Sequence, residues 1–189
     1  LTALLGFSLL MGFGGAFISL LMSKPMAKWS TGTRIINQPQ TQDEAWIVQT
    51  VERFANQANI KMPEVGIYEG APNAFATGRN PENAAVAATT GLLSMLSRDE
   101  VEGVMAHELA HVKNRDTLIM TMVATIAGAL SMLANFGMFF RSERNGLATL
   151  LAVLIPPFTA MIVQLAISRT REYGADRTGA EISGKPLAL

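Results

Sequence analysis

The chain has 189 residues, of which 49% are hydrophobic, and its 15 basic and 15 acidic residues give no net charge. Such a balance offers no electrostatic basis for binding nucleic acid. The absence of cysteine excludes disulfides, thiol nucleophiles and thiolate metal sites. A positive mean hydropathy of +0.27 directs attention to the long uncharged stretches of the chain.

Three uncharged stretches, residues 1–23, 117–140 and 145–168, each have about the 20 residues that a helix needs to cross a bilayer. Buried helices of a soluble protein are the competing interpretation. A chain this short could hardly surround three such apolar helices with polar structure. A signal peptide is rejected for residues 1–23, because no charged residue precedes the apolar run. We therefore predict three transmembrane helices.

Residues 24–116 form a polar segment that is long enough for a small domain. A capping box at Thr41 to Glu44, followed by apolar residues at helical spacing, predicts a helix that ends near Asn59. Residues 65–67 and 84–89 are short strand candidates.

The alanine-rich strand candidate, residues 84–89, lies beyond a segment, residues 74–78, that turn signals bracket on both sides. We suggest that residues 84–89 form an edge strand, which would pair with an extended peptide substrate through main-chain hydrogen bonds. An ordinary interior strand and an alanine helix are the alternatives. The predicted fold class is mainly α with a small β component (α+β), as an integral membrane protein.

A second capping box, Ser97 to Glu100, predicts the helix that carries both histidines of the chain. His107 and His111 fit the pattern H-E-x-x-H. At this spacing two imidazoles lie on one helix face with Cβ atoms about 5–6 Å apart, so both can bind one ion. Glu108 is offset by one residue and suits a general base that takes a proton from a water at the metal. A histidine pair beside a glutamate also occurs without any metal, so a third ligand is required.

The third ligand must be an oxygen, because the chain offers no cysteine and no further histidine. Asp116 is too close along the same helix, and Glu143 falls in the loop at 141–144, which we place across the membrane. Glu172 is the best candidate. Asp176, four residues later, could accept a hydrogen bond from a ligand histidine and fix its orientation. We expect one zinc ion per chain.

Two predicted spans separate His111 from Glu172, so both residues return to the same side of the membrane. The flanking basic residues on that side are Lys24, Lys28, Arg34, Lys113, Arg115, Arg169, Arg171 and Arg177, whereas the loop at 141–144 has only two. By the positive-inside rule, segments 24–116 and 169–189 are cytoplasmic and 141–144 is extracytoplasmic. We expect helices to run continuously from the bilayer into the site.

The chain resembles the HtpX family of membrane-bound zinc metalloproteases, which are relatives of the CaaX prenyl endopeptidases. The matching residues are Leu20 to Lys24, Asn73 to Gly78, the HELAH segment with Asn114 and Asp116, Ser168-Arg169, Arg171-Glu172 and Asp176. The resemblance implies a multi-pass protein of the bacterial inner membrane, which cleaves damaged or misassembled membrane proteins at the cytoplasmic face during stress. It also implies His107, His111 and Glu172 as zinc ligands and Glu108 as the catalytic base.

Members of that family usually have four spans and continue into a longer cytoplasmic region, so we expect this chain to be a fragment with a truncated C-terminus. Two other functions stay open. A CaaX-type prenyl-protein endopeptidase would use the same site on lipidated peptides, and a non-catalytic membrane scaffold would bind no zinc. The sequence makes no prediction about the oligomeric state.

Overall fold

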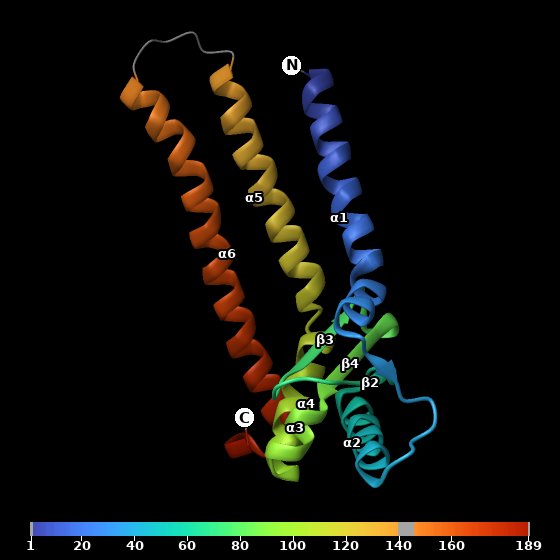
Figure 1. The fold of residues 1–189 in the computed structure, drawn as a ribbon. Helices are drawn as coiled ribbons and strands as arrows, with labels where there is room; N and C mark the ends of the chain where they lie inside the picture. The colour runs from blue at the N-terminus through green and yellow to red at the C-terminus, as the bar shows by residue number, and fades with distance from the viewer. Residues whose placement is uncertain (1, 140–145, 189) are drawn as a thin grey trace. The chain divides into compact units, whose positions relative to one another are not determined.

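The computed structural model describes residues 2–139 and 146–188 (Figure 1). In chain order its helices and strands are α1 (Thr2–Thr31), β1 (Arg34–Ile35), α2 (Gln42–Ala58), β2 (Glu64–Tyr68), β3 (Ala74–Gly78), β4 (Ala84–Thr89), α3 (Thr90–Met95), α4 (Arg98–Lys113), α5 (Asp116–Phe139) and α6 (Gly146–Ser183), with short 3₁₀ helices at Pro81–Asn83 and Pro186–Ala188. The chain divides into two compact units. One contains Leu1–Ser19 and Ile119–Thr170, and the other contains Leu20–Leu118 and Arg171–Leu189. The fold is mainly helical with a small sheet, as the predicted fold class states.

The sheet has four strands in the order β1-β2-β4-β3. β2 and β4 are parallel, whereas β1 and β3 pair antiparallel with β2 and β4. The expectation that residues 84–89 form an edge strand is therefore wrong. β4 is interior, and all six of its residues are buried. Its alanines let other segments approach both faces of the sheet, and the edge beside it is β3, a segment for which the sequence indicated only the turns on either side.

The hydrophobic core lies between one face of this sheet and helices α2 and α4. Alternate residues of the strands, Val65, Ile67, Ala84, Val86 and Ala88, belong to it, as expected from the two-residue period of a strand. The helices contribute the largest fully buried side chains, which include Ile47, Val51 and Phe54 from α2 and Val101, Met105 and Leu109 from α4. This packing fixes α4 against the sheet (Figure 1).

Two predicted helix starts are confirmed. The Thr41 hydroxyl accepts a hydrogen bond from the Glu44 amide at 3.1 Å, and α2 ends at Asn59 in the left-handed conformation with φ 54°. Ser97 and Glu100 form a reciprocal capping box at the start of α4. The helix that carries both histidines thus begins where its sequence indicates.

The helix with the histidines does not continue into α5, contrary to the expectation of continuous helices. It ends at Lys113, and Arg115 has a φ of 57°. The backbone amide of Arg115 donates to the Val112 carbonyl at 3.1 Å, which closes a tight turn before Asp116 opens α5. By contrast, α6 is one helix that contains most of the third predicted span together with Glu172 and Asp176.

Of the described helices, one segment is long and apolar enough to cross a membrane, Leu9–Thr31, with 23 residues and a hydropathy of 1.4. It overlaps the predicted first span and extends past it. The predicted spans 117–140 and 145–168 fall largely within α5 and α6 but include residues outside the described part of the chain, where the loop at 141–144 also lies. These boundaries and their division between membrane and cytoplasm stay predictions.

Candidate metal centre

The two histidines lie one turn apart on α4 and point to the same place. Their rings are nearly perpendicular, at 88°, with centroids 4.7 Å apart. The Nε2 atoms of His107 and His111 are 3.1 Å from each other. Both side chains are only partly exposed, so the pair lies at the edge of the core rather than free in solvent.

Glu172 of α6 completes a triangle with the two imidazoles. Its Oε2 atom lies 3.3 Å from Nε2 of His107 and 3.7 Å from Nε2 of His111. A tetrahedral ion whose ligands lie at about 2.0–2.1 Å separates those ligands by about 3.3 Å. The three atoms are therefore spaced as the ligands of such an ion would be, and they form the one His/Asp/Glu group of this kind found among the described residues.

The remaining nitrogen of each histidine faces a carboxylate. His107 Nδ1 lies 2.9 Å from Oδ1 of Asp176, and His111 Nδ1 lies 2.7 Å from Oδ2 of Asp116. Each Nδ1–H donates to its carboxylate, which assigns the tautomer and leaves both Nε2 atoms with lone pairs. The lone pairs of the two Nε2 atoms and a carboxylate oxygen of Glu172 then point to the same place. These electron-rich atoms repel one another unless a cation lies between them. The donor set fits a metal ion.

The sequence predicts that Asp116 lies too close along the histidine helix to bind the metal ion, and it predicts no other role for this residue. In the structure Asp116 instead binds the outer nitrogen of His111, and its second oxygen accepts a hydrogen bond from Arg171 Nη1 at 3.3 Å. The sequence around Asp116 does not predict this contact. The contact depends on the end of the helix at Arg115, where there is neither a glycine nor a proline, the residues that usually mark a helix end.

Glu108 is directed toward the sheet edge, where its carboxylate accepts a hydrogen bond from the Ala76 backbone amide. Burial raises the pKa of the Glu108 carboxyl above its ordinary value of 4.5. The nearby histidines and the Ala76 amide oppose that rise, whereas the charge of Glu172 adds to it. A raised pKa makes this carboxylate a stronger base near neutral pH.

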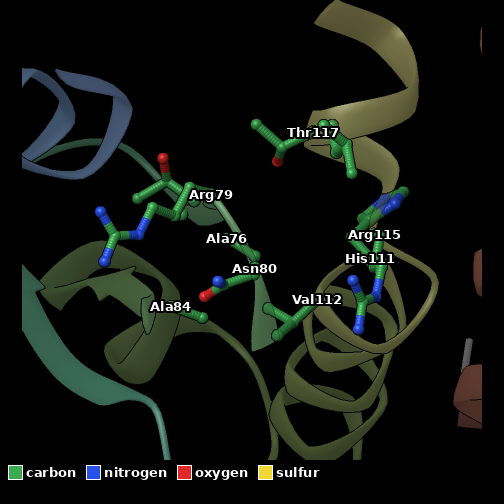
Figure 2. A pocket seen from close by; sticks show the side chains of 11 residues that line it. Ala76, Arg79, Asn80, Ala84, His111, Val112, Arg115 and Thr117 are labelled. Atoms are coloured by element: carbon green, nitrogen blue, oxygen red, sulfur yellow. The ribbon is translucent and has the colours of Figure 1, made fainter. Parts of the chain in front are cut away.

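Among the described residues, no strand pairs with the outer side of β3, which runs beside the histidine helix. The Thr89 amide donates to the Asn73 carbonyl at 2.9 Å, so Asn73 faces β4. Backbone groups alternate in direction along a strand, so those of Ala74, Ala76 and Gly78 face away from β4. Figure 2 shows a pocket between this strand and α4, with Ala76 on one wall and His111 and Val112 on the other.

The profile of peptidase family M48 matches residues 41–188, which include every residue of this centre. The chain is also 47% identical over 200 residues to a protein named "Protease HtpX homolog" from Polaromonas naphthalenivorans (strain CJ2), covering 98% of this chain and 69% of that protein. The chain belongs to the HtpX-like members of peptidase family M48.

The fold of this M48 member is similar to that of Ste24p from S. mikatae, with a TM-score of 0.69 at 18% sequence identity. The likeness covers 96% of this chain but 48% of Ste24p, so the chain spans about half the length of that structure. The chain is thus a member of a peptidase family, and the triangle described above is its candidate metal centre.

Proposed function

We propose that this M48 member is a zinc metalloendopeptidase, with one zinc ion held by His107, His111 and Glu172. The convergence of two imidazole Nε2 atoms and one carboxylate oxygen at 3.1–3.7 Å is the observation that carries the proposal. Nitrogen and carboxylate ligands of this kind are typical of catalytic zinc sites, which bind three protein groups and keep a fourth position open. Asp176 holds His107 with its Nε2 toward the ion.

Zinc, when bound, would polarise the scissile carbonyl and make a water molecule acidic enough to attack near neutral pH. Glu108 would take the proton from the attacking water and deliver it to the nitrogen of the leaving amine. The hydrogen bond from the Ala76 amide orients the Glu108 carboxylate, and burial increases its basicity. One side chain can therefore serve first as base and then as acid.

The substrate would bind as an extended strand along the outer side of β3. The outward carbonyls of Ala74, Ala76 and Gly78 would accept main-chain hydrogen bonds from the substrate, which makes binding largely independent of side-chain sequence. This assignment replaces residues 84–89, which the sequence suggested for the same purpose. A broad preference of this kind suits the cleavage of misfolded or damaged polypeptides.

We further propose that the protein is a multi-pass protein of the bacterial inner membrane, with its active site on the cytoplasmic side. The supporting observations are the apolar helix Leu9–Thr31, the apolar predicted spans at 117–140 and 145–168, and the basic residues that flank them. Its substrates would be membrane proteins damaged under stress. The 47% identity to a protein named as an HtpX homologue supports this role.

Metal analysis and peptide cleavage by the purified protein test the proposal. We expect one zinc per chain in the parent. The Glu108→Gln variant should keep its zinc and lose cleavage by about 10²–10⁴-fold, and Glu172→Ala should lose zinc as well as activity. Glu181→Ala, at an exposed position on the same helix, is the matched control for Glu172. Undiminished cleavage by Glu108→Gln, or full zinc in Glu172→Ala, would contradict the assignments.

The same assay separates the other functions. A CaaX-type prenyl-protein endopeptidase would cleave a prenylated C-terminal peptide in preference to its unlipidated counterpart. A non-catalytic scaffold would contain no stoichiometric zinc. The proposed enzyme binds zinc and cleaves unlipidated unfolded polypeptides.

A further inference from the structure

Asp116 is a nearly buried carboxylate that is bound from both sides. Its side chain is 7% exposed. Oδ2 accepts a hydrogen bond from His111 Nδ1 at 2.7 Å, and Oδ1 accepts one from Arg171 Nη1 at 3.3 Å. A carboxylate that is buried and bound in this way is not free in solvent. It connects the Arg171 guanidinium to the His111 imidazole in a fixed geometry.

The turn at Arg115 brings Asp116 to this place. In a continuous helix, the fifth residue after His111 would lie about 7.5 Å along the axis and about 140° around it, out of reach of the ring. Arg115 has a φ of 57°, which interrupts the helix after α4, and the Asp116 carboxylate then lies within hydrogen-bond reach of the His111 ring. Arg115 thus adopts a backbone conformation that is unfavourable for a residue other than glycine. It does so directly before Asp116, the residue that binds His111.

Arg171 directly precedes Glu172 on α6. The pair of Arg171 with Asp116 therefore joins the turn that follows the histidine helix to the part of α6 that supplies the third ligand. All of these residues, Asp116, Arg171, His111 and Glu172, belong to the same compact unit. The ion pair therefore joins the segment after α4, which carries the two histidine ligands, to α6. It does so at Arg171, the residue next to the third ligand, Glu172.

We propose that Asp116 and Arg171 are positioning residues for the metal centre. Asp116 holds His111 in the tautomer and orientation that direct Nε2 toward the ion. The pair of Asp116 with Arg171 sets the distance between α6 and the histidines, and so places the Glu172 carboxylate. The inference rests on the proposed function, since it assigns these residues to the same zinc site.

The other histidine is held differently. Its partner Asp176 is 56% exposed and lies on α6 itself, four residues after Glu172. That contact orients His107 and joins α4 to α6 at the protein surface. Solvent competes for an exposed carboxylate, so the buried link through Asp116 should contribute more to the order of the centre.

Helix α4 offers a matched control pair away from the histidines. Arg53 of α2 lies 2.5 Å from Glu102, whose side chain is 9% exposed, while that of Arg53 is 51% exposed. This is again an arginine bound to a nearly buried carboxylate, but it holds no metal ligand. Breaking it should lower stability and leave the affinity for zinc unchanged.

The experiment measures zinc affinity by competition with a chelator at constant pH, in the protein purified in detergent, and records the visible absorption of the Co²⁺ form. Asp116→Ala should weaken zinc binding about 10–100-fold, the usual effect of removing a group that orients a ligand histidine. Asp116→Asn should recover part of the loss, because its amide oxygen still accepts the Nδ1 hydrogen. Arg171→Met should weaken binding too, and Arg171→Lys should weaken it less.

The Co²⁺ spectrum of the Asp116 and Arg171 variants should shift, because it reports ligand geometry, whereas the spectra of Glu102→Gln and Arg53→Met should match the parent. The double variant Asp116→Ala/Arg171→Met should lose less zinc-binding free energy than the sum of the losses in the two single variants, because both changes break the same contact. Parental zinc affinity in Asp116→Ala and Arg171→Met would overturn the inference alone. A parent that binds no zinc would overturn the proposed function and this inference with it. If Asp116→Ala does not fold, the Asp116→Asn and Arg171→Met variants decide the question.

Discussion

Gly179 of α6 lies directly against the backbone of His107. A Cβ atom added at position 179 would be 3.1 Å from the His107 nitrogen and 3.2 Å from its Cα. Glu172, Asp176 and Gly179 are spaced i, i+4 and i+7 and share one face of the helix. The face of α6 that supplies the third ligand therefore approaches α4 as closely as a residue without a side chain permits.

We expect the Gly179→Ala variant to push α6 away from α4. Because the nearest atoms are backbone, they cannot move aside as a side chain would, and strain of this kind typically costs about 1–3 kcal/mol. Displacement of α6 would also move Glu172, so zinc affinity should fall together with the free energy of unfolding. Thermal unfolding and chelator competition measure the two effects.

Gly174→Ala is the matched control on the same helix. Its added Cβ would meet only the Asn114 side-chain nitrogen, at 3.9 Å, an ordinary contact. Replacing an interior helical glycine by alanine otherwise stabilises a helix by about 0.5–1 kcal/mol. Equal behaviour of the two alanine variants would show that the close approach at Gly179 does not position the ligand.

A second prediction concerns the substrate edge at β3. If peptides pair with the outward carbonyls of this strand, methylating single amide nitrogens of a peptide substrate should slow cleavage at alternate positions, because outward groups recur every second residue. Each lost hydrogen bond should cost about 1 kcal/mol, or about fivefold in kcat/KM. The measurement is kcat/KM for a series of singly N-methylated peptides. A uniform decrease along the series, without alternation, would speak against strand pairing.

A third prediction concerns the pH dependence of stability through Glu44. The Gln40 amide donates to its Oε2 at 2.7 Å, Arg34 binds Oε1, and these contacts lower the pKa of the Glu44 carboxyl below its ordinary value of 4.5. Because the folded pKa is the lower one, the stabilisation is complete above the unfolded pKa. It is lost as the pH falls through the folded value.

The Glu44→Gln variant should therefore be less stable than the parent at neutral pH, by about 1–3 kcal/mol for hydrogen bonds to a charged group. The difference should shrink as the pH falls below 4.5. Glu52→Gln, at an exposed position on the same helix, is the control and should change little. Urea unfolding at several pH values measures the difference. A constant gap between parent and Glu44→Gln at every pH would contradict the role of this ionised carboxylate.

The sequence alone was sufficient for features that depend on neighbouring residues or on composition. Capping boxes at Thr41 and Ser97 marked the starts of two helices, since the hydrogen bonds that make them lie within one turn. The spacing of His107 and His111 placed two imidazoles on one face for the same reason. Composition narrowed the search for a third ligand, because a chain without cysteine or further histidine leaves only oxygen donors.

Tertiary structure decided the features that depend on distant segments. Alanines at residues 84–89 suit an edge strand or an interior one equally, and only the pairing of β4 with both β2 and β3 made it interior. Likewise, Asp116 is a short distance from His111 along the chain, but its contact requires a break in the helix at Arg115 and a partner, Arg171, 55 residues away. The free energy of such long-range contacts selects among local conformations that the sequence leaves nearly equal, so they become visible only in the folded chain.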